Sequence, residues 1–189
     1  MNIFYVDENP VVAAESLVDK HVVKMILESA QLLSTAHRFL DGEQIEEKKY
    51  VNGSLPPRYR KAKRWKLSDA RENVLYQATH INHPSAVWCR SSVENYNWLV
   101  DHFFALMAEY THRYGKTHKC FGEISYMLQS PPKNLKEYDW TPMPSCMDVQ
   151  YIVSKDPLTN YRNYYRIGKA RMHSWKNRQP PKWINDNGK

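Results

Sequence analysis

Residues 18–37, VDKHVVKMILESAQLLSTAH, contain the pattern that decides the fold. On a helical wheel at about 100° per residue, the apolar residues of this stretch and of its continuation to Leu40 fill one arc, which predicts a long amphipathic helix. We expect this helix to run from Asp19, which can cap it, to Asp41. Gly42 then stands where a left-handed residue often ends a helix.

A second stripe on the same wheel is polar. It consists of His21, Lys24, Glu28, Gln31 and Thr35. Glu28 and His21 lie at the edge of the apolar arc, where partial desolvation favours acid–base chemistry. Lys24 and Glu28 are four residues apart, so they can instead form a simple surface pair worth a few tenths of a kcal/mol. The wheel leaves both interpretations open.

Further stretches of the chain also predict helices. Asn9 and Pro10 are typical of the start of a short helix, after an apolar lead-in at residues 1–6 that could form a strand. A further helix is expected from about Ser68 to Thr79. A long helical region is expected over residues 80–116, with Pro84 near its start, a capping box formed by Ser91 and Glu94, and Gly115 at its end. A last helix is expected from Asp156–Pro157 to about Trp175.

The remaining stretches predict loops around one domain. Residues 43–57 are charged and then turn-like (NGSLPP), and residues 120–155 are rich in proline and aromatic residues. We therefore expect a mostly α protein, a single compact helical domain over residues 1–189 with long irregular loops. Residues 43–66 are expected to form an exposed basic loop and residues 176–189 a flexible tail.

Composition favours anionic partners and an intracellular location. The chain carries 27 Lys and Arg against 20 Asp and Glu, a formal charge of +7, which suits nucleic acid, nucleotides and phosphates. Its three cysteines, Cys89, Cys120 and Cys146, are widely spaced without a CxxC pair, so neither a disulfide framework nor a zinc knuckle is indicated. No signal peptide and no apolar run of about 20 residues occurs. We expect a cytoplasmic protein with no membrane partner.

The segment RYRKAKRWK at residues 58–66 has the composition of a polyanion-binding surface. Its cations suit phosphates, and Tyr59 and Trp65 offer rings for stacking. A solvated loop without a ligand can have the same composition. The candidates for phosphate or nucleotide contact along the whole chain are His21, Lys24, Arg58, Arg60, Lys61, Lys63, Arg64, Arg90, Lys116, Arg162 and Lys169.

Residues 160–175, NYRNYYRIGKARMHSW, interleave tyrosines with cations in a way that suits stacking and phosphate contact. Tyrosines at helical spacing also occur in ordinary cores, and tryptophan near a helix end can simply pack. The candidates for stacking on an extruded base are Trp65, Trp88 and Tyr165.

Several chemistries lack support in the sequence. No GxGxxG, P-loop, GxSxG or HExxH motif occurs, which argues against dinucleotide, NTPase, serine hydrolase and zincin functions. His80 and His83 straddle an expected turn, and no paired cysteine completes a tetrahedral set with them. We therefore expect no metal and no cofactor, and we expect Asn82 or His83 to cap the helix that follows.

The chain resembles an uncharacterised protein family common in tailed phages. The stretches that carry this resemblance are DKHVVKMILESAQLLSTAH, NHPSAVW, YGKTHKC and YRNYY. More distantly, it resembles the pyrimidine-dimer DNA glycosylase family of the endonuclease V type. That family carries Asp-x-His on its first long helix and a catalytic glutamate nine residues after the aspartate. Asp19, His21 and Glu28 match this spacing.

The second resemblance implies a small helical domain and a mechanism. In that family the N-terminal α-amine attacks the anomeric carbon of the sugar to form a Schiff base, and the glutamate assists. The matching catalytic residues here are Met1 and Glu28. Two positions depart from the family: Asn2 is too large for efficient removal of Met1, and Leu27 replaces an arginine before the glutamate. From the sequence alone we expect no covalent adduct at Met1.

Together these features predict a phage-type nucleotide-binding or nucleic-acid-binding protein of an infected bacterial cytoplasm. Its leading function is DNA-glycosylase-like action on an N-glycosidic bond of DNA or a nucleotide. Two alternatives stay open: a non-catalytic protein that sequesters a nucleotide immune signal to counter host defence, and a virion or host-takeover interaction protein without a nucleotide. The sequence names neither the base nor the oligomeric state.

Overall fold

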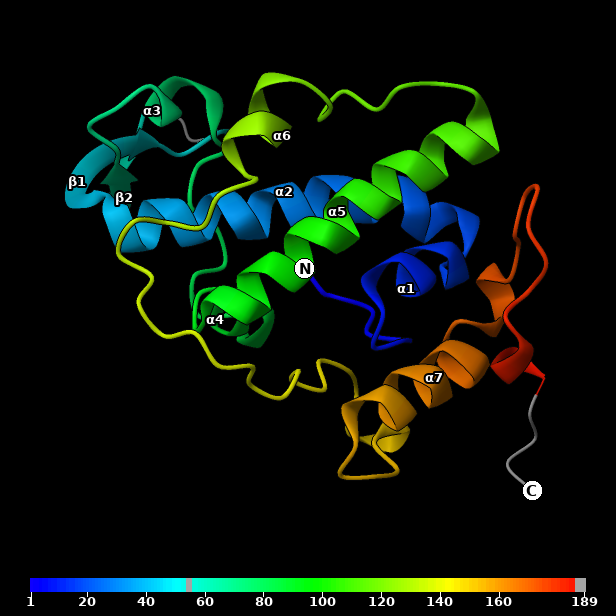
Figure 1. Cartoon of the computed structure of the whole chain (residues 1–189). Helices are drawn as coiled ribbons and strands as arrows, with labels where there is room; N and C mark the ends of the chain where they lie inside the picture. Colours follow the sequence, from blue (N-terminus) through cyan, green and yellow to red (C-terminus); the bar gives the residue numbers. More distant parts are fainter. Residues whose placement is uncertain (54–55, 186–189) are drawn as a thin grey trace.

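The computed structural model describes residues 1–53 and 56–185, and it is mostly helical (Figure 1). Its α-helices are α1 (Pro10–Ser16), α2 (Asp19–Asp41), α3 (Arg71–Val74), α4 (Pro84–Cys89), α5 (Val93–Tyr114), α6 (Glu123–Met127) and α7 (Pro157–Gly168). Two strands, β1 (Glu43–Tyr50) and β2 (Tyr59–Lys66), and the short 3-10 helices Val149–Tyr151, Ala170–Met172 and Lys182–Ile184 complete the described elements. The predicted mostly α fold is confirmed.

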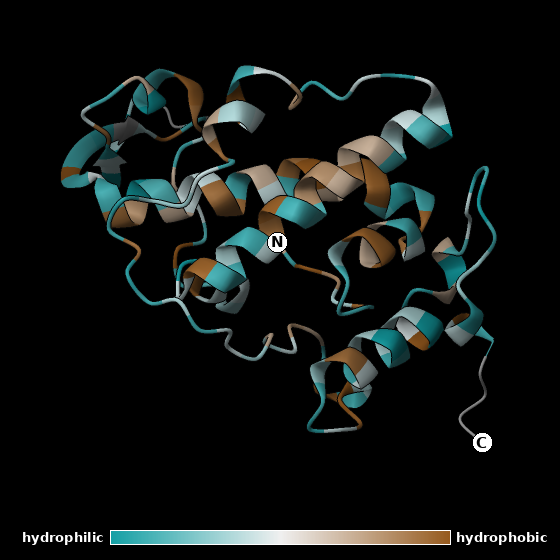
Figure 2. Ribbon diagram, in the orientation of Figure 1, coloured by the Kyte–Doolittle hydropathy of each residue, from teal (hydrophilic) through white to brown (hydrophobic). Residues whose placement is uncertain are grey.

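The core lies between α2 and α5, which pack along each other and bury apolar residues from both (Figure 2). Helix α1 packs on α5, and α4 packs on α2. Apolar burial is the main favourable term in folding, and here it fixes the position of α2, which carries the polar stripe. No helix within the described ranges is both long and apolar enough to cross a bilayer.

Helix α2 has the predicted bounds, but its two ends differ from expectation. Val18 occupies the N-cap position without a side-chain hydrogen bond, so Asp19 is the first helical residue and not the cap. Gly42 is extended, with φ −91°, and not left-handed. A Cβ at this position would lie 2.5 Å from the carbonyl oxygen of Arg38. Glycine is needed here because two backbone segments approach closely.

The expected basic loop over residues 43–66 is instead an antiparallel hairpin. Strand β1 pairs with β2 in a register that runs from Glu43 opposite Lys66 to Tyr50 opposite Tyr59. The hairpin is largely exposed, as predicted for the loop. Its charged residues hid the strands from sequence reasoning, because the alternation that marks a half-buried strand is weak when both faces are polar.

Other element boundaries also needed correction. Residues 1–6 form no strand, and the helix expected from Ser68 to Thr79 shrinks to α3. The long region over residues 80–116 divides into α4 and α5, and Ser92 rather than Ser91 caps α5 by accepting a hydrogen bond from the Asn95 N–H. The last helix ends at Gly168 instead of Trp175. The expected N-cap at Asn9 with Pro10 as the first helical residue, and the expected end of the helix at Gly115, are confirmed. Gly115 is left-handed, with φ 64°.

The expected flexible tail is docked wherever the structure describes it. Arg178 contacts Glu109 at 2.8 Å and Glu15 at 2.9 Å, and the Lys176 N–H donates to the Asp19 carboxylate. Ile184 is buried. Residues 176–185 thus make specific contacts with the helical body, while residues 186–189 lie outside the described residues.

Candidate active site around Met1 and Glu28

The N-terminus of the chain meets the middle of α2 at Glu28. The α-amino nitrogen of Met1 lies 4.0 Å from Glu28 Oε2, and the backbone N–H of Asn2 donates to the same oxygen at 3.2 Å. Lys24 Nζ lies 3.1 Å from Glu28 Oε1. The Glu28 side chain is 14% exposed and the Met1 side chain 3%. A partly buried carboxylate thus faces an amine, a backbone donor and an ammonium group.

His21 lies on the same helix as Glu28 and is buried instead of facing solvent. Its ring stacks on Phe4 with a centroid distance of 4.2 Å, and its Nδ1 shares a hydrogen bond with the Tyr165 hydroxyl. Burial, followed by the positive charges of Lys169 and Lys24, lowers the pKa of His21 to about 4. The ring is therefore neutral at pH 7 and buried. Contact between His21 and a phosphate stays a prediction, which would require this buried ring to become accessible.

His83, which the sequence indicated only as a helix cap, feels the charges of the Met1 amine and of Glu28. Its Nδ1 accepts the Ser85 N–H at 3.2 Å, so His83 is the N-cap of α4, as expected. Burial, the Met1 amino group and His80 lower the pKa of His83, while the carboxylate of Glu28 opposes them. Those influences place His83 within electrostatic range of the amine and the carboxylate. The signal in the sequence was its position before Pro84, which indicated only a cap.

Two lysines bring positive charge to the same region. Lys24 projects from α2 and is two-thirds exposed, and Lys169 follows α7 with Nζ 4.6 Å from the ring centre of Tyr164 and 6.0 Å from that of Phe4. Both charges act on His21. Lysines beside an amine and a carboxylate suit a ligand with a phosphate.

The hairpin cations occupy a separate surface beyond the C-terminal end of α2. Lys61 pairs with Glu46 at 3.0 Å, and Arg64 pairs with Glu47 and Glu72. The other cations predicted on this segment are Arg58, Arg60 and Lys63, all exposed. The structure therefore does not bring the basic segment and Glu28 into one pocket.

The remaining predicted cations are dispersed. The guanidinium of Arg90 lies 4.2 Å above the ring of Phe39. Arg162 donates to the Val6 carbonyl and pairs with Asp7 at 3.1 Å, which anchors the N-terminal segment. Lys116 is exposed just after α5. Arg162 thus has a structural role in this conformation.

None of the three predicted stacking residues presents an open ring face. Tyr165 is fully buried, and Trp65 and Trp88 are 8% and 4% exposed. Trp65 packs against Phe39, and Trp88 packs edge-on against Trp140. Tertiary packing, which a single sequence does not report, decides this burial. Stacking of these rings on a base stays a prediction, which would require their neighbours to move.

Asp19 has a structural role. It accepts hydrogen bonds from Arg113, from the Ser174 hydroxyl and from the Lys176 N–H. Burial opposes ionisation, but the hydrogen bonds from Ser174, Lys176 and Arg113 outweigh it and lower the pKa of Asp19. The aspartate of the Asp-x-His motif therefore joins α2, α5 and the C-terminal segment.

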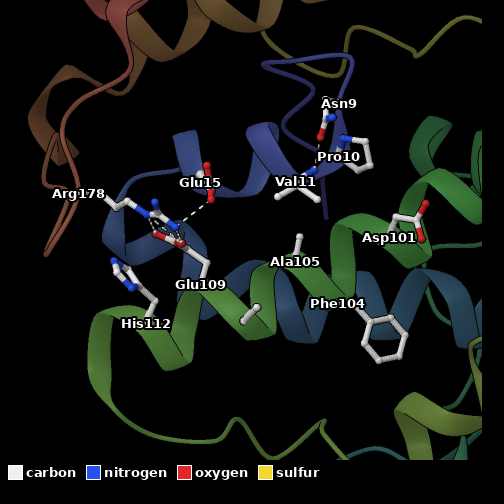
Figure 3. Close-up of a pocket in the computed structure, with 11 residues that line it drawn as sticks. Asn9, Pro10, Val11, Glu15, Asp101, Phe104, Ala105, Glu109, His112 and Arg178 are labelled. Atoms are coloured by element: carbon white, nitrogen blue, oxygen red, sulfur yellow. Dashed lines mark hydrogen bonds and ion pairs between the residues drawn. The ribbon is translucent and has the colours of Figure 1, made fainter.

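A large hollow lies elsewhere on the described structure. It measures about 820 Å³ and is formed by α1, α5 and Arg178 (Figure 3). Inside it, the Glu109 carboxylate is already engaged by Arg113 and Arg178. Neither Met1 nor Glu28 lines it. Volume alone would therefore have pointed away from the amine and the carboxylate.

The fold is mostly helical, and its N-terminal amine lies beside a partly buried glutamate. A family model described as pyrimidine dimer DNA glycosylase matches residues 1–121, and the chain belongs to this family. The predicted resemblance is thereby confirmed. Neither the curated proteins nor the solved structures contain a match. The matched residues include Met1 and Glu28, whereas Tyr165 and Lys169 come from the part of the chain beyond the match.

Proposed function

We propose that this protein is a DNA-glycosylase-like enzyme that breaks an N-glycosidic bond in DNA, with the Met1 α-amine as nucleophile and Glu28 as acid and base. The observation that carries the proposal is the 4.0 Å separation of the amine from the Glu28 carboxylate. A nucleophile beside a carboxylate is the usual signature of covalent catalysis assisted by proton transfer. Family membership supports DNA as the substrate.

The proposed step balances as follows. The lone pair of the Met1 nitrogen forms a bond to the anomeric carbon, and the bond from that carbon to the base breaks with its electron pair on the base nitrogen. The departing base takes a proton from water. The Glu28 carboxylate takes one proton from the attacking nitrogen, whose lone pair then forms the C=N bond as the ring C–O bond breaks with its electron pair on the oxygen, and Glu28 gives that proton to the ring oxygen. Loss of the second nitrogen proton to water leaves a neutral imine.

This proposal revises the sequence-based expectation of no adduct at Met1. The expectation rested on Leu27 and on retention of Met1. In the structure the retained amine itself reaches Glu28, and the Asn2 N–H supports the same carboxylate. A retained methionine is therefore compatible with amine chemistry. Lys24 and Lys169 are proposed to hold a phosphate beside the reacting sugar.

The cations beyond the site are proposed to bind the DNA backbone. Those on and near the hairpin are Arg58, Arg60, Lys61, Lys63, Arg64 and Arg90, with Lys116 on another surface. A largely exposed strand rich in cations can follow a phosphate backbone without reading its bases. We expect these cations to determine the affinity for DNA, and the Met1 amine and Glu28 to determine the rate of the reaction.

Borohydride trapping tests the proposed function. The protein is incubated with abasic or ultraviolet-damaged duplex in borohydride, and the product is digested and mapped by mass spectrometry. We expect a covalent adduct at Met1, because borohydride reduces an imine and leaves a non-covalent complex untouched. Intact-mass measurement verifies that the tested protein begins at Met1. Cleavage without any adduct at Met1 would refute the amine as nucleophile.

Glu28→Gln tests the carboxylate. The amide keeps the shape of the side chain, so the fold should be nearly unchanged, while turnover should fall by about 100-fold or more because a general acid and base contributes that much. Glu123→Gln, which alters an exposed carboxylate on α6, is the matched control. Full activity of Glu28→Gln would remove Glu28 from the mechanism. Tight stoichiometric binding of a free nucleotide without turnover would instead favour the sequestering alternative.

A further inference from the structure

We propose that Asn2 and Tyr161 form a clamp that positions the Met1 amine against Glu28, so that α7, outside the family match, is needed for turnover. The inference rests on the proposed function and assigns Tyr161 as a positioning residue. Figure 1 shows α7 in the half of the molecule that holds the N-terminal segment. The contact between them is a hydrogen bond from the Tyr161 hydroxyl to Asn2.

Asn2 is held at its backbone and at both side-chain polar atoms. Its Nδ2 donates to the Cys146 carbonyl at 2.8 Å, and its Oδ1 accepts from the Tyr161 hydroxyl at 2.9 Å. The Ile3 N–H also donates to Oδ1, at 2.8 Å, while the Asn2 N–H reaches Glu28. Three separate parts of the chain thus fix the residue next to the amine.

The Tyr161 hydroxyl makes several of the hydrogen bonds around Asn2. The side chain is fully buried, and its hydroxyl also lies 3.0 Å from the Pro144 carbonyl and accepts from the Cys146 N–H at 3.2 Å. Burial raises the pKa of Tyr161 well above its usual value, so the phenol stays protonated and can donate. Asp156 caps α7 by accepting from two backbone N–H groups, which fixes the start of the helix that carries Tyr161.

The clamp matters because a chain terminus is normally the least ordered part of a domain. A nucleophile must sit about 3–3.5 Å from the atom it attacks, and a misplacement of about 1 Å can cost about 100-fold in rate. Glu28 holds the N-terminus from α2. The contacts of Asn2 with Tyr161 and with the Cys146 carbonyl add anchors from the C-terminal half of the chain, so the amine keeps its place while a sugar approaches.

Tyr161→Phe removes one hydroxyl and tests the clamp. We expect kcat to fall by about tenfold or more, because the amine is misplaced. KM and the affinity for duplex with a tetrahydrofuran abasic analogue should change less than twofold, because no DNA contact is lost. Tyr96→Phe is the matched control: Tyr96 is also fully buried and donates to the Leu128 carbonyl, but it lies on α5 and contacts neither Asn2 nor Glu28.

A double-mutant cycle with Asn2→Leu tests whether the two residues act together. Leucine, like asparagine, is too large for efficient removal of Met1, and its side chain makes no hydrogen bond. We expect the combined variant to be hardly slower than Asn2→Leu alone, because the contact that Tyr161→Phe breaks is already lost in that variant. Multiplicative losses of rate, or equal losses in Tyr161→Phe and Tyr96→Phe, would overturn the clamp.

A chemical measurement separates the clamp from the proposed function. In the free protein, excess sulfo-NHS-acetate acetylates exposed amines, and mass spectrometry of the N-terminal peptide reports the rate at Met1. We expect Tyr161→Phe to raise this rate several-fold and Tyr96→Phe to leave it unchanged. A raised rate in a protein without glycosylase activity would retain the clamp and refute the function. An unchanged rate in Tyr161→Phe would refute the clamp even in an active enzyme.

Discussion

The hairpin allows a sharp test of how this protein holds DNA, because its cations fall into two groups. Lys61 and Arg64 are paired with glutamates of β1 at 3.0 and 2.9 Å. Arg60 and Lys63 are exposed and have no carboxylate partner within the described part of the chain. A cation already paired in the protein releases fewer counterions when DNA binds. We therefore expect Arg60 and Lys63 to make the phosphate contacts.

The magnitude follows from counterion release. Each phosphate contact on duplex DNA contributes about 0.9 to the slope of log K against log salt concentration. Arg60→Gln combined with Lys63→Gln should therefore lower the steepness of this slope by about 1.8. Between about 50 and 200 mM salt, the variant should lose about tenfold less affinity than the original protein. Exposed substitutions of this kind barely alter the free energy of unfolding.

A charge-neutral variant of the same hairpin is the control. Lys61→Gln combined with Glu46→Gln removes one ion pair and leaves the net charge unchanged. Fluorescence anisotropy of a labelled undamaged duplex, measured at four or five salt concentrations, gives the slope for each protein, and thermal unfolding verifies the fold. We expect the control to keep the original slope. If both double variants show one and the same slope, the assignment of Arg60 and Lys63 to phosphates is refuted.

Two further predictions concern stability. Burial lowers the pKa of His21, His37 and His102 from 6.5 to about 4, so between these values the unfolded chain binds more protons than the folded one. The free energy of unfolding should be highest above about pH 6.5 and should fall as the pH drops through this window, by up to about 3 kcal/mol per histidine. Urea unfolding at several pH values measures this free energy, and a constant value down to about pH 4.5 would contradict the prediction. Gly42→Ala should destabilise the fold by about 1–3 kcal/mol, because its Cβ would lie 2.5 Å from a backbone oxygen, and an unchanged melting temperature would show that the backbone can shift.

The long helices were predictable because their signals are local. The apolar arc of α2 repeats at helical spacing over six turns, so its bounds at Asp19 and Asp41 could be read from the sequence. The hairpin was not predictable in the same way. Its register depends on pairing between residues such as Glu43 and Lys66, and on the packing of Trp65 against α2, neither of which leaves a local pattern.

The candidate site was predictable only in part, for the same reason. Spacing alone indicated Glu28, because it sits on the polar stripe of one helix. Tyr161 could not be assigned, since it meets Asn2 across 159 residues of sequence. His83 gave only the signal of a helix cap. Long-range contacts of this kind are set by tertiary packing, which a single sequence does not report.

The spacing of the Asp-x-His and Glu motif has a physical explanation in this structure. Phe4 stacks on His21, and the Met1 amine reaches Glu28. Seven residues of helix, from His21 to Glu28, span about 10.5 Å, and the three residues from Phe4 to Met1 can reach up to about 10 Å. The two lengths match, so a ring stacked at one end brings the amine to the carboxylate at the other. One additional residue before Met1 would carry the amine about 3 Å past Glu28. The histidine thus sets the register in which the glutamate and the amine meet.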